Sequence, residues 1–365
     1  MNITKIELRR LQVPLITPFK TALRTVNAVH DIIVLIHTDS GHIGYGGAAA
    51  TVVITGDSHG AIIAAIESVI APQLIGQSIY AFNQLLQRLH SSLVHNTSAK
   101  AAVEIALYDL WAQAHQQPLY RMLGGGAHSG QLETDVTISV DSIDKMLADS
   151  EHALARGYRT LKIKIGTNLH DDIARVTAIA EHVAGRASLR LDVNQGWTAK
   201  QTVYAMQQLE RAGVELELVE QPVPAHDIAG MKFITERVLT PVMADESAFG
   251  PREVLTLLQQ GAADIINIKL MKTGGLSKAL WIADLCALYG VECMIGCMLE
   301  SSVSVAAAAH LAAAKSHVIT KVDLDSPSLA STQPVLGGCL FEAASIQLNQ
   351  TPGLGISAIP SLQPL

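Results

Sequence analysis

The sequence contains few of the residues that mark secreted, nucleic-acid-binding or membrane proteins. Its four cysteines form no CxxC pair and no zinc spacing, which argues against a disulfide framework or a structural zinc site. Only 16% of the residues are charged, the formal net charge is −7, and no lysine or arginine run is present, which excludes a basic nucleic-acid surface. The most apolar stretch, residues 303–314, is too short to span a bilayer. The opening segment MNITKIELRR has no apolar core of signal-peptide length, so we expect a cytoplasmic protein without a membrane or nucleic-acid partner.

Hydrophobic residues, in contrast, make up 49% of the 365 residues, enough for one large core and a second, smaller domain. Residues 3–15 and 31–47 are strand-like, and the second run contains a hairpin break. Residues 98–117 carry apolar side chains at three- and four-residue spacing, with Ser98 as the expected N-cap. Strands followed by helices predict an α+β domain over residues 1–125.

The chain after this segment has a different rhythm, in which short apolar runs alternate with helical patterns. The step from one run to the next is roughly 24 to 30 residues, the size of a βα unit. Six or more such units favour a closed (β/α) barrel over an open sheet, and we place this barrel at residues 126–334. The runs are TLKIKIG (160–166), SLRLDVNQGW (188–197), LELVEQP (216–222), PVMADES (241–247), DIINIKLMKTGG (264–275), ECMIGCMLESS (292–302) and ITKVDLDS (319–326).

Polar residues recur where these strands end, which is the face that carries the active site in barrels of this kind. Three consecutive strands each contribute one carboxylate, from Asp192, Glu220 and Asp245. A single aspartate at a strand end is commonly a helix cap or a turn former. Three carboxylates at one level instead predict a site for Mg²⁺, one ion per subunit, with Mn²⁺ as a substitute, because hard cations take oxygen ligands.

Lysines flank these carboxylates on both sides. Lys164 precedes them and Lys269 follows them, so the two amines should face each other across the barrel mouth. Lys162 places a second positive charge beside Lys164, and like charge and burial both favour the neutral amine that acts as a base. A simpler alternative is that these lysines only neutralise the carboxylates and exchange no protons.

The ordered motifs resemble those of the enolase superfamily, muconate-lactonizing subgroup, over nearly the whole chain. The motifs are KIK (162–164), DVNQGW (192–197), VEQP (219–222), ADES (244–247) and NIKLMKTGG (267–275). The resemblance implies a modified TIM barrel of the (β/α)7β type, capped by the N-terminal domain and completed by a C-terminal segment at about 335–365. It also implies proton transfer by lysine through an enediolate stabilised by Mg²⁺. A homo-oligomer is expected by analogy alone.

Within the subgroup the sequence is most similar to the dipeptide epimerases, especially those acting on L-Ala-D/L-Glu. Asp323 and Asp325 resemble the pair that binds the dipeptide ammonium, and Met298 lies in a motif that resembles the substrate-lining strand. Residues 19–26 resemble the capping loop, where Arg24 is expected to pair with an acidic side chain. The resemblance implies two-base inversion by Lys164 and Lys269, aided by Lys162, in peptidoglycan peptide metabolism. Gly47 departs from the family pattern, in which a glutamate is usual, and this bears on loop packing.

Three alternatives stay open. The first is an epimerase of hydrophobic dipeptides, since Lys20 and Arg24 are also compatible with plain loop residues. The second keeps the fold and changes the reaction to that of a cycloisomerase, an o-succinylbenzoate synthase or an N-acylamino acid racemase. Those substrates have no ammonium that needs two carboxylates, although Asp323 and Asp325 could also form a capped turn. The third is a non-catalytic metal-binding barrel.

Overall fold

A three-stranded antiparallel sheet with strand order β1-β2-β3 begins the chain in this computed structural model, which describes residues 1–21, 24–126 and 130–365. Both faces of the sheet are covered, because alternate residues of β2 belong to different apolar clusters: Ile32 and Val34 pack on the helical side, and Ile33 packs on the other. The elements of this part are β1 (Ile3–Lys20), β2 (Thr25–Thr38), β3 (Ile43–Ala49), α1 (His59–Ala64), the π-helix η1 (Ala65–Ile70), α2 (Ala71–Leu74), α3 (Phe82–Ser91), α4 (Thr97–Ala114) and α5 (Leu119–Met122).

The predicted hairpin break is confirmed between β2 and β3. Gly41 adopts a φ of +81°, a left-handed conformation that glycine reaches at no steric cost. Its N–H donates to Thr38 O over 3.1 Å and closes the turn. The predicted cap of the long helix is wrong: α4 begins at Thr97, so Ser98 lies inside the helix and donates its N–H to Asp57 Oδ2 at 2.9 Å.

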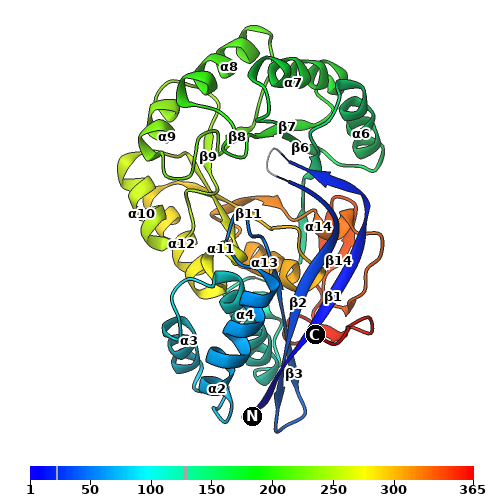
Figure 1. Cartoon of the computed structure of the whole chain (residues 1–365), viewed down its shortest axis with the longest axis vertical. Helices are drawn as coiled ribbons and strands as arrows, with labels where there is room; N and C mark the ends of the chain where they lie inside the picture. The colour runs from blue at the N-terminus through cyan, green and yellow to red at the C-terminus, as the bar shows by residue number, and fades with distance from the viewer. Residues whose placement is uncertain (22–23, 127–129) are drawn as a thin grey trace.

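Eight parallel strands in the order β12-β11-β10-β9-β8-β7-β6-β5 form the barrel, with a covering helix after each of the first seven strands and only the four-residue α14 (Ser326–Leu329) after the last. This is the predicted (β/α)7β architecture, and Figure 1 shows the helices arranged around the strands. The elements are β5 (Val136–Ile138), α6 (Ile143–Ala155), β6 (Thr160–Lys164), α7 (Leu169–Val183), β7 (Ser188–Asp192), α8 (Ala199–Arg211), β8 (Leu218–Glu220), α9 (Ile228–Thr235), β9 (Val242–Ala244), α10 (Pro251–Gln260), β10 (Ile265–Lys269), α11 (Leu270–Thr273), α12 (Leu276–Tyr289), β11 (Glu292–Gly296), α13 (Ser302–Ala314) and β12 (Ile319–Asp323).

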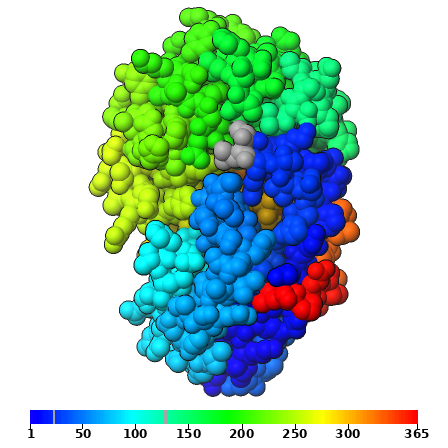
Figure 2. Space-filling model, viewed as in Figure 1, coloured from blue at the N-terminus to red at the C-terminus, as the bar shows by residue number. Residues whose placement is uncertain are grey.

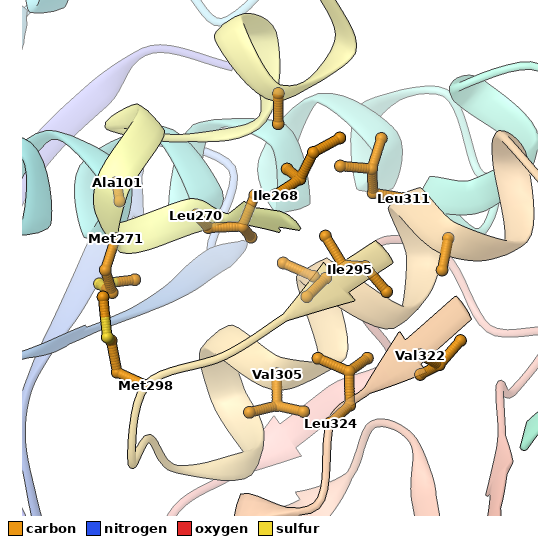
Figure 3. Packing of buried hydrophobic residues seen from close by; sticks show 14 of the residues in the cluster. Ala101, Ile268, Leu270, Met271, Ile295, Met298, Val305, Leu311, Val322 and Leu324 are labelled. Atoms are coloured by element: carbon orange, nitrogen blue, oxygen red, sulfur yellow. The ribbon is translucent and has the colours of Figure 1, made fainter. Parts of the chain in front are cut away.

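Apolar side chains pack on both sides of the barrel wall. The outward-facing Ile268, Ile295 and Val322 pack against α13 and its neighbours, as Figure 3 shows. Inside the barrel a separate apolar cluster lies below the strand ends, formed by Leu218, Met243, Ile265 and Met294. We call these four residues the lower layer. The charged residues at the strand ends therefore lie above the apolar lower layer.

The end of the chain returns to the N-terminal sheet. Gln363 and Arg10 exchange backbone hydrogen bonds of 2.9 Å, and Leu119 donates its N–H to Gly353 O. Figure 2 shows the C-terminal residues lying over the N-terminal strands. The elements here are α14 (Ser326–Leu329), β13 (Leu336–Gly337), β14 (Leu340–Glu342), β15 (Ser345–Gln347) and β16 (Ile356–Ala358), with β15 also pairing with β4 (Gln131–Glu133). The domain limits given above stay predictions.

None of the described helices combines the length and the apolar character needed to cross a membrane.

Candidate active site

The predicted lysines and carboxylates lie at or just beyond the carboxyl ends of the barrel strands. Parallel pairing sets Lys164 beside Asp192, and Asp192 beside Glu220. On the other side of the sheet, Lys269 and Asp323 are both paired with the same residue of β11. Because the carboxyl ends of parallel strands meet at one edge, the sequence order of these residues becomes a ring around the barrel mouth.

The three predicted metal-binding carboxylates are buried and contacted by lysine amines. Asp192 and Glu220 are 0% exposed and Asp245 is 1% exposed. Lys164 Nζ lies 2.5 Å from Asp192 Oδ2, and Lys269 Nζ lies 2.7 Å from Asp245 Oδ2. A buried carboxylate needs such a partner, since an uncompensated charge in this position is strongly destabilising.

Lys162 occupies the centre of the cluster. Its Nζ lies 2.6 Å from Glu220 Oε2, 2.7 Å from Asp323 Oδ2 and 3.1 Å from Asp192 Oδ2. Three carboxylates thus share one ammonium group. Lys162 connects the predicted metal-binding set to the predicted ammonium-binding pair.

The carboxylates decide the protonation of the buried lysines. Burial lowers the pKa of Lys269, but the negative charges of Asp245 and Glu220 outweigh it and hold that pKa above the usual lysine range. Burial also lowers the pKa of Lys162, and Asp323, Glu220 and Asp192 reverse the shift in the same way. The sequence argument concerned Lys164 and counted only burial and like charge, whereas at Lys162 and Lys269 the contacting carboxylates outweigh burial.

The carboxyl groups of the same cluster shift in different directions. Burial and the charge of Asp192 raise the pKa of Glu220 to about 7. Burial acts in the same sense on Asp192 and Asp245, but the amines that contact them outweigh it and hold both pKa values below the usual range. Among these three carboxyl groups, Glu220 is therefore the one most easily neutralised.

Lys164 and Lys269 lie on opposite sides of one cavity. β6 and β10 have three strands between them in an eight-stranded barrel, which places the two amines across its diameter. Both line a cavity of about 570 Å³, measured out to open solvent. Gly296 leaves room for one of them, because a Cβ there would come within 2.9 Å of Lys269 Cε. A small molecule in the cavity has an amine on each side.

Asp323, Asp325 and Met298 line the same cavity. Asp325 Oδ2 accepts a hydrogen bond of 2.7 Å from Thr137 N–H, which fixes the second carboxylate against β5. Burial and the nearby charge of Asp323 raise the pKa of Asp325 to about 6. Met298 is 6% exposed, and Figure 3 shows it pointing toward the buried side chain of Met271.

The β1–β2 ribbon, which we call the capping ribbon, brings Phe19 and Arg24 to the cavity wall, and the segment after β3 adds Val53 and Ile54. Figure 1 shows the β1–β2 ribbon extending from the N-terminal sheet to the barrel mouth. Residues 22–23 of the predicted capping loop lie outside the described residues. Lys20 does not line the cavity: its side chain is 41% exposed, and its Nζ lies 2.5 Å from Asp141 Oδ2.

Several residues of the site were not predicted from the sequence. Lys272 is 1% exposed and donates to Asp245 O at 2.6 Å, to the side chain of Asp245, and to Asn267 O at 2.8 Å. Asn267 Nδ2 donates a hydrogen bond of 2.9 Å to Glu220 Oε1. The sequence signal that could have identified Lys272 is its spacing from Lys269. The two lysines are three residues apart at the end of a strand, which is about one helical turn.

The three carboxylates fit a divalent cation by chemistry, although the side chains do not surround one. Among residues 1–21, 24–126 and 130–365, no three acidic, histidine or cysteine side chains are gathered in ligand geometry, since lysine amines lie between them. The donors are hard oxygens on three neighbouring strands, which suits Mg²⁺. Glu220 Oε2 is buried and accepts no hydrogen bond, and its one compensating contact is the ion pair of 2.6 Å with Lys162 Nζ.

Two family matches cover most of the chain. Residues 4–124 match the mandelate racemase / muconate lactonizing enzyme N-terminal domain, and residues 145–361 match the enolase C-terminal domain-like family. The chain therefore belongs to the enolase superfamily, in the mandelate racemase / muconate lactonizing enzyme family.

Three similar proteins of this family are named epimerases. The chain is 49% identical to an L-Ala-D/L-Glu epimerase of Clostridium acetobutylicum, covering 98% of this chain and 99% of that protein. A substrate-liganded complex of the L-Ala-D/L-Glu epimerase from Bacillus subtilis is 48% identical, with a TM-score of 0.95 over 98% of this chain and 99% of that one. A dipeptide epimerase from Enterococcus faecalis V583, in complex with Mg and L-Leu-L-Tyr, is 40% identical with a TM-score of 0.94, over 98% and 100% of the chains.

Proposed function

We propose that this chain is a Mg²⁺-dependent dipeptide epimerase that interconverts L-Ala-L-Glu and L-Ala-D-Glu. One observation carries the proposal: Lys164 and Lys269 lie on opposite sides of a cavity, and the lysines that line it contact the three buried carboxylates Asp192, Glu220 and Asp245. Inversion at a carbon needs a base on one face and an acid on the other, and this arrangement supplies both. The named relatives support the same reaction class.

Lys164 and Lys269 exchange roles with the direction of the reaction. One amine removes the α-proton of the C-terminal residue, and the opposite ammonium returns a proton to the other face. Lys162 stays between Glu220 and Asp323, where its positive charge favours the negative charge that develops on the substrate carboxylate. When bound by Asp192, Glu220 and Asp245, the divalent cation would supply further stabilisation of that charge.

Asp323 and Asp325 would bind the free ammonium of the dipeptide. Both carboxylates line the cavity on the side of β5 and β12. This pair favours a dipeptide over the substrates of cycloisomerases, o-succinylbenzoate synthases or N-acylamino acid racemases. Those substrates offer no ammonium group for two buried carboxylates to bind.

Arg24 supports an acidic C-terminal residue. It stands at the cavity wall, where a guanidinium pairs with a carboxylate in fork geometry. A second candidate is the epimerisation of hydrophobic dipeptides, favoured by the apolar neighbours Phe19, Val53 and Ile54. Mixed walls of this kind accommodate the methylenes of a glutamate side chain as well as an aliphatic one.

The test of the reaction is proton NMR of L-Ala-L-Glu in D₂O with the Mg²⁺-loaded protein. We expect loss of the α-proton signal of the glutamate residue and appearance of L-Ala-D-Glu. A non-catalytic metal-binding barrel gives neither change, and that result would reject the proposal. A panel of dipeptides with varied second residues then decides the substrate: a preference for L-Ala-L-Phe or L-Ala-L-Leu would reject the acidic assignment and leave the epimerase assignment intact.

A further inference from the structure

The barrel has a seam directly beneath the predicted ammonium-binding aspartates. Among the described residues, the order of hydrogen-bonded strands begins at β12 and ends at β5. These edge strands are joined by Asp135 N–H, which donates to Val322 O over 3.3 Å. A side chain adds a second connection, since Leu324 N–H donates to Thr134 Oγ1 at 2.8 Å. Strand β12, which ends at Asp323, is thus connected to the β5 side of the barrel by a few irregular hydrogen bonds and not by a regular ladder.

Arg190 reaches this seam through the barrel interior from β7. Its Nη1 donates to Asp135 Oδ2 at 2.7 Å and to Val322 O at 3.1 Å, so one nitrogen bonds both edge strands. Its Nε and Nη2 bond the two carboxylate oxygens of Glu217 at 2.8 and 3.2 Å. The side chain is 7% exposed. A planar guanidinium held at both ends in this way has little freedom to move.

The residues held by Arg190 adjoin the ammonium subsite. Val322 is followed in the chain by Asp323, whose carboxylate lies in the cavity. Two residues after Asp135 comes Thr137, whose N–H orients the carboxylate of Asp325. A shift of β12 against β5 would move both carboxylates relative to each other.

Stability alone gives no reason for a charge at this position. The surrounding interior is the apolar lower layer, and Met294 Sδ itself lies 3.8 Å from Arg190 Nη1. Replacing a buried ion pair by apolar side chains of similar volume is often neutral or stabilising. One oxygen of the partner, Asp135 Oδ1, is also buried without a hydrogen bond, which adds a cost.

We propose that Arg190 and Asp135 are positioning residues for the ammonium subsite: together they fix β12 against β5 so that Asp323 and Asp325 converge on the N-terminal amine of the dipeptide. This inference rests on the proposed function. It assigns substrate discrimination to a guanidinium that lies below the cavity and does not line it. A variant that disturbs this positioning should lose its selectivity for a dipeptide with a free amine. A general loss of activity would not by itself support the positioning role.

The experiment compares L-Ala-L-Glu with N-acetyl-L-Ala-L-Glu, which lacks the positive charge. The measured quantity is the inhibition constant of the acetylated dipeptide divided by the KM of the free one. In the paired variant Arg190→Met/Asp135→Asn, which leaves only the partly exposed Glu217 without its partner, we expect this ratio to fall about tenfold, with kcat changed less than threefold. Arg190→Lys keeps the charge and should restore part of the ratio. The matched control is Arg186→Met, which removes an arginine bound to the exposed Glu151 and should leave the ratio unchanged.

Asp323→Asn separates the two ways of failing. If Asp323→Asn collapses the ratio but the paired Arg190 variant keeps it within twofold of wild type, the positioning role is wrong and the proposed function stands. If neither variant changes the ratio, the ammonium subsite itself is wrong, and the inference falls with it. Thermal unfolding followed by circular dichroism confirms that each variant is folded, and Arg190→Lys carries the test if the paired variant is not.

Discussion

Leu218 and Glu220 lie two residues apart on β8 and both face the barrel interior, yet they belong to different environments. Leu218 packs in the apolar lower layer, whereas Glu220 contacts the amine of Lys162 at 2.6 Å. The same contrast repeats on β9, where Met243 lies below Asp245. The lower layer removes apolar surface from water and favours folding. The charged residues at the strand ends around the cavity, which we call the upper layer, are buried, and burying a charge costs free energy unless the charge has a partner. The difference indicates that the lower layer serves stability and the upper layer serves chemistry.

The largest expected effect is the loss of a lysine from the upper layer. Lys269→Met should reduce epimerisation by on the order of 10³-fold, because one face of the substrate loses its acid or base. Thermal stability should change little in comparison, since Asp245 keeps the amine of Lys272 as a partner. Activity is measured by polarimetry and stability by thermal unfolding. Equal epimerisation by the variant and the wild type would contradict the assignment.

Removal of the divalent cation should affect activity as strongly and the fold hardly at all. The carboxylates have lysine partners in the absence of a cation, so chelation leaves no orphaned charge. We expect epimerisation to stop on treatment with a chelator and to return with Mg²⁺ or Mn²⁺, while the circular dichroism spectrum stays the same. Full activity in cation-free protein would rule out a role for the metal.

A cavity in the lower layer should produce the opposite pattern. Ile265→Ala removes a side chain that is 3% exposed and should reduce the free energy of unfolding by about 2–5 kcal/mol. The kcat of the folded fraction should stay within a few-fold of wild type. Urea denaturation and steady-state kinetics on the same preparation measure the two effects. A loss of kcat as large as that of Lys269→Met would remove the distinction between the layers.

Arg24→Ala tests the part of the upper layer that the capping ribbon supplies. Loss of one charge-assisted contact should lower kcat/KM for L-Ala-L-Glu roughly tenfold. The value for L-Ala-L-Leu should stay nearly constant, because that side chain has no carboxylate. A proportional loss for both dipeptides would assign Arg24 a structural role.

The smallest effect concerns a buried polar group outside both layers. His310 is fully buried, accepts a hydrogen bond of 2.9 Å from Tyr120 N–H at Nδ1, and burial lowers its pKa to about 3. The unfolded chain takes up a proton at this residue near pH 6.5 and the folded chain does not, so stability is lost as pH falls below that value. His310→Asn should remove a slope of up to about 1.4 kcal/mol per pH unit. An unchanged slope between pH 6 and 4.5 in denaturant titrations would contradict this origin.

The strand ends were predictable because polar residues interrupt apolar runs at regular spacing. The register that brings Lys164, Asp192 and Glu220 to one level follows directly from that regularity. The first strand, β5, escaped prediction because its three residues, Val136–Ile138, form no apolar run. Its position emerges only when the barrel closes.

Contacts between distant segments were beyond the reach of the sequence. Lys20 pairs with Asp141, 121 residues away, and no local pattern connects them. Lys272 lies in the motif at residues 267–275, but its burial against Asp245 depends on the short α11 helix that places it there. Arg190 was overlooked for a related reason: in the sequence it is one charged residue in a strand, and its two edge-strand partners belong to distant parts of the chain.

The most direct test of the central claim is face-selective exchange. Lys164→Ala and Lys269→Ala proteins are incubated separately with L-Ala-L-Glu and L-Ala-D-Glu in D₂O with Mg²⁺, and α-proton loss is followed by NMR. Two lysines on opposite sides of the cavity predict that each variant exchanges the proton of at most one epimer, and that the epimer differs between the variants. Exchange of the same epimer by both variants, or undiminished epimerisation by either, would contradict the account.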